Sequence, residues 1–214
     1  KSSYISLILF AFLGLLLTQL TYLIAIAETN AGTATVLQYV CPVGVLAYTC
    51  IKDRVGPTVS EIASMLLAIG GTFLIATHGQ LNQLAITPKG LGWGLFSAFA
   101  YALYIILPLN LIKKWGSMLV IGVGMLLPGI LMLPFSGLVS FQGHYSSDNL
   151  WALFGLIVLG TIFAYTVFLK GTSMVGAVKG SLLASIEPIS AVFFAYMIMN
   201  DQFYAIDFIG MGMI

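Results

Sequence analysis

The sequence predicts an all-α membrane protein, a helical bundle of about eight transmembrane helices. Two observations lead to this fold class. Hydrophobic residues make up 60% of the chain and charged residues 7%, whereas soluble domains hold roughly 45–50% and about 25%. The hydrophobic residues also form continuous runs of about 20 residues, the length that a helix needs to cross a bilayer. The mean hydropathy of +1.06 agrees with both.

Each expected helix is an apolar run bounded by Gly, Pro or charged residues. The first run ends before Glu28, the second before Lys52 and the fourth before Lys113. The last run holds only about twelve residues, too few for a span, so we expect the natural chain to continue beyond Ile214. In order, the eight runs are 4–26, 31–51, 59–77, 90–112, 117–139, 150–169, 175–199 and 203–214.

The basic residues predict the orientation of these helices. All but one of them fall on a single side, and only Lys89 falls on the other. Because Lys and Arg gather in cytoplasmic loops, we expect the basic side to be cytoplasmic. His78 and His144 fall in loops on the outer side, where we expect them to be solvated. The residues on the basic side are Lys1, Lys52, Arg54, Lys113, Lys114, Lys170 and Lys179.

Two similar segments lie 146 residues apart in the chain. TNAGTATVLQYVCPVGVLAY surrounds Pro42, and VGAVKGSLLASIEPISAVFF surrounds Pro188. An odd number of crossings separates them, so the two copies enter the bilayer in opposite directions. Inverted repeats with interrupted helices are typical of secondary transporters. The second copy is preceded by two helices and the first by none, so we expect two further helices upstream of Lys1 in a ten-helix fold.

Polar and aromatic residues inside the spans are the candidate substrate-binding residues. An acid at mid-span, Glu187, is costly and must face the interior of the bundle. Polar side chains held away from lipid either line a cavity or join helices by hydrogen bonds, and the sequence leaves both interpretations open. The candidates are Glu187, Gln38, Gln19, Tyr22, Tyr101, Tyr104, Tyr165 and Trp93.

Pro42 and Pro188 lie near the middle of their spans. Each removes one backbone hydrogen bond and frees the carbonyl four residues earlier, at Gln38 and Ala184. The prolines are either plain kinks or hinges for alternating access. Glu187 likewise has two interpretations: it exchanges a proton with the substrate or the gradient, or it is protonated and bonds the carbonyl freed by Pro188.

Several functions are not supported by the sequence. No Gly-rich loop for ATP is present, because GAVKGS has the wrong spacing. No catalytic residues or metal ligands are predicted, since the aspartates and histidines fall in loops or at helix ends, and we expect no cofactor and no enzyme activity. The net charge of +1 gives no sign of the basic surface that nucleic-acid binding needs.

The chain resembles the EamA-type branch of the drug/metabolite transporter superfamily. The resemblance rests on YLIAIAETNAGTATVLQYVCP, the KDR loop and IASMLLAIGGTFLIA, and on YTVFLKGTSMVGAVKGSLLASIEPISAVFF with its Glu187–Pro188 pair. One departure is that the first copy has Cys41 where the second has Glu187.

The resemblance implies ten helices in two inverted five-helix repeats. Residues 1–77 would be the last three helices of the first repeat, and 90–214 the second repeat with its last helix truncated. It also implies a multi-pass protein of the plasma membrane, such as a bacterial inner membrane, that exports small organic metabolites. Its partners would be the lipid bilayer and a small-molecule substrate. The resemblance leaves open whether the protein forms a homodimer. The alternative is a receptor or structural bundle whose polar faces only pack helices.

Overall fold

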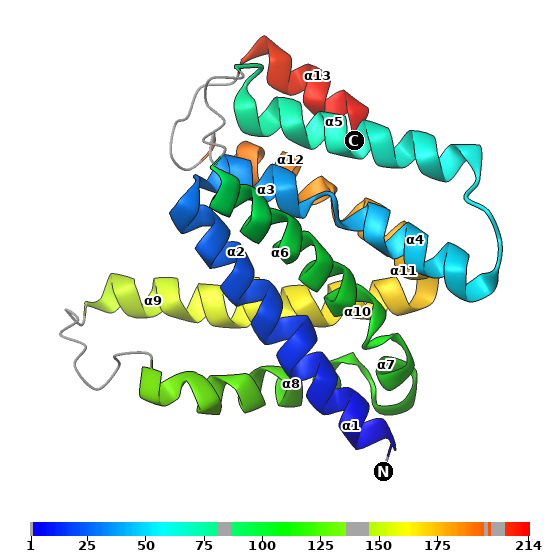
Figure 1. Cartoon of the computed structure of the whole chain (residues 1–214). Helices are drawn as coiled ribbons and strands as arrows, with labels where there is room; N and C mark the ends of the chain where they lie inside the picture. The colour runs from blue at the N-terminus through cyan, green and yellow to red at the C-terminus, as the bar shows by residue number, and fades with distance from the viewer. Residues whose placement is uncertain (1, 81–86, 136–145, 195–196, 198–203) are drawn as a thin grey trace.

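The computed structural model describes residues 2–80, 87–135, 146–194, 197 and 204–214, and these form helices joined by short connections, without strands (Figure 1). Five helices in these ranges are long and apolar enough to cross a membrane, and α8 is a shorter apolar helix. The predicted all-α membrane bundle is therefore confirmed. The five are Ser3–Glu28, Ala31–Asp53, Val59–Thr77, Pro88–Trp115 and Asn149–Val175.

The first half of the chain forms three of these spans. The Asn30 side chain caps α3 by accepting the Thr33 N–H at 2.7 Å, and Thr58 and Glu61 form a capping box at the start of α5. The elements are α1 (Ser2–Leu9), the π-helical η1 (Phe10–Leu16), α2 (Leu17–Glu28), α3 (Ala31–Gln38), α4 (Cys41–Asp53) and α5 (Val59–Thr77).

In the second half, α9, η5 and α10 form one continuous rod (Figure 1). Thr87 caps α6 by accepting the Gly90 N–H at 2.9 Å. The elements are α6 (Pro88–Ile106), α7 (Leu109–Trp115), α8 (Ser117–Met132), the 3₁₀ turn η3 (Leu133–Phe135), α9 (Ser147–Gly155), the π-helical η5 (Leu156–Phe163), α10 (Ala164–Val175), α11 (Ala177–Leu183), α12 (Ile186–Phe194) and α13 (Ala205–Met213).

Two expected helices are interrupted. The run 31–51 is divided into α3 and α4 by a turn at Tyr39 and Val40, and the run 175–199 into α11 and α12 by a turn at Ala184 and Ser185. Each turn precedes a proline, which cannot donate to the preceding turn but fits the first turn of a new helix. The expected ends of 117–139 and 175–199 lie partly outside the described residues.

Helix α6 lies at the centre of the packing. It contacts η1, α2, α3 and α4, and its residue Ile105 is fully buried together with Phe10, Val45, Val120 and Leu169. On another side of the molecule α13 lies along α5 (Figure 1). Gly71 and Gly210 allow this close approach, since a Cβ on Gly71 would lie 2.6 Å from the Gly210 carbonyl oxygen.

Several features recur at the 146-residue offset. The π-helical segments η1 and η5 begin at Phe10 and Leu156, and the breaks at Tyr39–Val40 and Ala184–Ser185 come within one residue of this offset. Glu61 Oε2 accepts the Thr58 N–H at 2.9 Å, and Asp207 Oδ2 accepts the Tyr204 N–H at 2.9 Å. These recurrences agree with inverted repeats, but the ten-helix arrangement stays a prediction.

Candidate functional site

A cleft of about 380 Å³ lies between α6, the η5–α10 rod and the break that separates α11 from α12. The break lies just before Pro188, and Ala184, Ile186 and Glu187 at this break line the cleft. The lining residues are Tyr101, Tyr104, Gly160, Ala164, Tyr165, Phe168, Leu183, Ala184, Ile186 and Glu187.

One wall of the cleft is aromatic and is built around Tyr104. The ring of Tyr104 stacks with Tyr101 at 5.6 Å between centroids and with Phe168 at 6.3 Å. Tyr165 meets it edge-on at 5.8 Å. Behind the wall the buried Phe10 ring stacks on Tyr104 at 6.1 Å. The wall is therefore held by contacts among its own rings and by Phe10 behind it.

Glu187 supplies an acid to this cleft, and its side chain is exposed there. The Tyr39 hydroxyl donates to Glu187 Oε2 at 2.8 Å and also lies 3.1 Å from the Ala184 carbonyl oxygen. Pro188 has no N–H for that carbonyl, which instead accepts the Glu187 N–H at 2.9 Å. Tyr39 thus joins the break between α3 and α4 to the break between α11 and α12.

A single hydroxyl proton cannot serve both acceptors fully. The Tyr39 hydroxyl is therefore shared between the Glu187 side chain and the Ala184 carbonyl oxygen, and a partner that takes Glu187 Oε2 would leave it to Ala184.

The structure brings together five of the eight candidate residues. Glu187, Tyr101, Tyr104 and Tyr165 line the cleft, and Gln19 Nε2 donates to the Tyr165 hydroxyl at 2.6 Å. Gln19 and Tyr165 are 146 residues apart, so this contact joins two positions that the predicted repeat relates.

The other three candidates do not appear in the described lining of this cleft. The Tyr22 hydroxyl bonds Thr35 Oγ1 at 2.8 Å and ties α2 to α3. Trp93 packs near Phe96, with 6.1 Å between ring centroids. Gln38 is the half-buried last residue of α3, next to the break.

Tyr39 is the residue that the sequence interpretation missed. Its position three residues before Pro42 was the available signal, because a phenol at mid-span must find a polar partner. The sequence could not name that partner, since Ala184 and Glu187 lie about 146 residues away and reach Tyr39 only through the packing of the two breaks.

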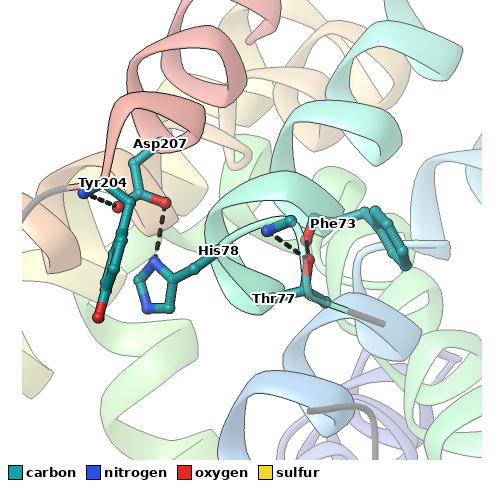
Figure 2. A network of polar contacts seen from close by, with 6 residues as sticks. Phe73, Thr77, His78, Tyr204 and Asp207 are labelled. Atoms are coloured by element: carbon teal, nitrogen blue, oxygen red, sulfur yellow. Dashed lines mark hydrogen bonds and ion pairs between the residues drawn. The ribbon is translucent and has the colours of Figure 1, made fainter. Parts of the chain in front are cut away.

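A second polar network joins α5 to α13 (Figure 2). The His78 ring lies 4.9 Å from the Tyr204 ring and its Nδ1 bonds Asp207 Oδ1 at 2.8 Å. Asp207 is completely buried, while His78 is 33% exposed. Thr77 Oγ1 accepts the Gly79 N–H at 3.2 Å and helps to hold this end of α5. The expectation that His78 is merely solvated is therefore wrong; His144 lies outside the described residues.

Comparison of the chain with known sequences finds one family model and several relatives. The model of the EamA-like transporter family matches residues 1–77 and 88–214. The uncharacterized inner membrane transporter YicL of Salmonella typhimurium is 35% identical over 210 residues, which cover 98% of this chain and 70% of that protein.

More distant relatives show the same coverage. The uncharacterized transporter YcbK of Bacillus subtilis is 23% identical over 202 residues, covering 92% of this chain and 65% of that protein. An uncharacterized transporter of Archaeoglobus fulgidus is 27% identical over 198 residues, covering 92% and 69%. The chain thus spans about two thirds of the length of the relatives that it matches.

Proposed function

Because the chain belongs to the EamA-like transporter family and is a membrane transporter rather than an enzyme, we propose that it moves small organic metabolites through the cleft at Glu187. The cargo class that we propose includes amino acids and drug-like compounds, and the direction is export across the plasma membrane. The name of the Salmonella relative, an inner membrane transporter, supports this location in a bacterial cell. Family membership favours this function over a receptor or a structural bundle.

One observation carries the proposal: the cleft lies where two interrupted helices meet. Tyr39 in the first break bonds Ala184 and Glu187 at the second. Discontinuous helices in secondary transporters bring backbone and side-chain polar groups to a substrate site at mid-membrane. In the inverted repeats that we propose, the two breaks would exchange conformations as the cleft opens first to one side of the membrane and then to the other.

We infer that Glu187 takes part in this exchange. The carbonyl freed by Pro188 is bonded by Tyr39 and by the Glu187 N–H, rather than by the Glu187 side chain. The carboxyl group is therefore available to the cleft, where a substrate or a proton competes with Tyr39 for it. In alternating access, the change of partner at Glu187 would accompany bending of the two interrupted helices at their breaks. Pro42 and Pro188 would act as the hinges.

The test is transport by the full-length protein and by Glu187→Gln. Cells sensitised to toxic amino-acid analogues should gain resistance when they express the wild type. Glu187→Gln keeps a hydrogen-bonding side chain but cannot release a proton, so we expect efflux to fall at least about tenfold and to lose its pH dependence. Glu28→Gln, which changes an exposed acid at the end of α2, should behave as the wild type.

Normal efflux with unchanged pH dependence in Glu187→Gln would show that Glu187 is only structural. Equal analogue sensitivity with and without the wild-type protein, at verified expression and over a broad panel, would contradict the proposed cargo class.

A further inference from the structure

We propose that the cleft selects organic cations, which are small molecules that carry an ammonium group beside an apolar body. This inference rests on the proposed function and names the substrate class of the same site. Three properties of the cleft support it: its charge, the chemistry of its walls and its volume.

The charge of the cleft is negative. Glu187 is the one charged side chain among the described residues that line it. Within the described part of the chain, Glu187 has no salt bridge, and its recorded side-chain partner is the neutral Tyr39 hydroxyl. An anionic substrate would meet a carboxylate and no basic group, whereas an ammonium group would supply the missing counter-charge.

The walls also favour a cation. Tyr101, Tyr165 and Phe168 are half-buried aromatic rings in the lining of the cleft, and the faces of such rings attract ammonium groups within about 6 Å. The remaining lining is apolar, with Leu183 and Ile186 beside the acid. These side chains suit the hydrocarbon part of an amine but offer no partner to a second charged group.

The volume of the cleft is compatible with a small cargo. At about 380 Å³, the cleft lies near the lower end of the roughly 300–1,000 Å³ that small-molecule sites occupy. It therefore suits a metabolite with a single ring or a short chain.

Binding of the ammonium group would alter the break. The group takes the place of the Tyr39 hydroxyl at Glu187 Oε2, and the Tyr39 hydroxyl then donates fully to the Ala184 carbonyl oxygen, which lies 3.1 Å from the hydroxyl oxygen. Occupancy of the cleft and the hydrogen bonding of the break are thus linked through one residue.

The experiment compares probes that share one ring and differ in charge. Purified full-length protein in lipid nanodiscs is titrated calorimetrically with benzyltrimethylammonium, phenethylamine, phenethyl alcohol and phenylpropionate. We expect the two cations to bind at least about tenfold more tightly than the alcohol, and phenylpropionate not to bind. Benzyltrimethylammonium cannot lose a proton, so its binding reports recognition of the charge alone.

Variants distinguish the contribution of the acid to cation binding from the contribution of the aromatic rings. Glu187→Gln should weaken cation binding at least about tenfold, and Glu28→Gln should leave it unchanged. Tyr165→Phe keeps the ring face and should retain cation binding, whereas Tyr165→Leu should weaken it several-fold. Preferred binding of phenylpropionate, or full cation affinity in both Glu187→Gln and Tyr165→Leu, would overturn the proposal.

Counterflow in proteoliposomes distinguishes this proposal from the proposed function. Transport of neutral or anionic amino-acid analogues without transport of the cations would contradict the substrate class and leave the carrier function intact. Tight, Glu187-dependent binding of cations with no counterflow of any probe would support the class and contradict the carrier function.

Discussion

Tyr39 shows how much can depend on one hydroxyl group in this protein. Its ring is buried and its oxygen contacts two groups at the other helix break, the Ala184 carbonyl and the Glu187 carboxylate. Few polar groups at mid-span can exchange partners without a large cost, because no water is present to replace a lost bond. Here the exchange is possible because both acceptors lie within reach of the same donor.

The first prediction concerns Tyr39→Phe. This change keeps the ring packing and removes both hydrogen bonds, so we expect a small loss of stability, about 1–2 kcal/mol. We expect a larger effect on function, an efflux rate lowered about tenfold or more, because Glu187 loses its link to the break. Thermal unfolding in detergent and efflux from cells measure the two effects, and unchanged efflux by a stable variant would contradict the link.

Among single residues, some of the predicted candidates line the cleft and others do not. Glu187 and the tyrosines of α6 and α10 could be predicted to face the interior of the bundle, where they line one cleft, since an acid or a phenol inside a span requires an interior partner. Tyr22 satisfies the same requirement with Thr35 on the neighbouring helix, so it was an equally good candidate and yet does not line the cleft. Helical spacing identifies a face of a helix, but it does not identify what packs against that face.

At the scale of elements, five of the expected spans appear as helices long enough to cross a membrane, whereas the breaks in two expected helices were predicted only as proline kinks or hinges. The apolar runs match the observed helices because hydrophobic length is a local property. Tyr39 joins the break between α3 and α4 to the break between α11 and α12, a long-range contact that the local sequence does not reveal. A proline alone is also compatible with a kinked, continuous helix.

The contact between α5 and α13 gives a second prediction at this scale. A Cβ on Gly210 would lie 2.9 Å from the Gly71 carbonyl oxygen, whereas a Cβ on Gly212 would meet nothing within 4 Å. Gly210→Ala should therefore lower stability by about 1–3 kcal/mol through overpacking, while Gly212→Ala should be neutral or stabilising. Thermal unfolding of the two variants in the same detergent measures this, and equal stability would contradict the close packing.

The same two helices carry a third prediction, at the network of Figure 2. Asp207→Ala removes the bonds to His78 and to the Tyr204 N–H from a buried site, so we expect a loss of about 1.5–3 kcal/mol. Glu61→Ala is the matched control, because Glu61 bonds the Thr58 N–H in the same way but is only half-buried. An equal or larger loss in Glu61→Ala would show that His78 adds nothing to the anchoring of α13.

At the scale of the whole molecule, the contacts agree with the predicted sides of the membrane. Lys114 Nζ donates to Ser3 Oγ at 2.8 Å, which joins two ends that were both expected in the cytoplasm. Thr87 Oγ1 donates to the Glu28 carbonyl oxygen at 3.2 Å, and His78 bonds Asp207, which joins ends that were expected outside. These bonds connect ends on one predicted side only, as a correct set of crossings requires.

The last prediction tests this orientation directly. In a background with Cys41 and Cys50 replaced by alanine, single cysteines are introduced as Ser146→Cys and Lys113→Cys, both at exposed positions. Because basic residues remain in the cytoplasm, we expect an impermeant thiol reagent added to intact cells to label Ser146→Cys and not Lys113→Cys. Permeabilised cells provide the control, in which both cysteines should react. The opposite pattern in intact cells would show that the predicted orientation is reversed. Labelling of both positions would show that the number of crossings between α7 and α9 is wrong.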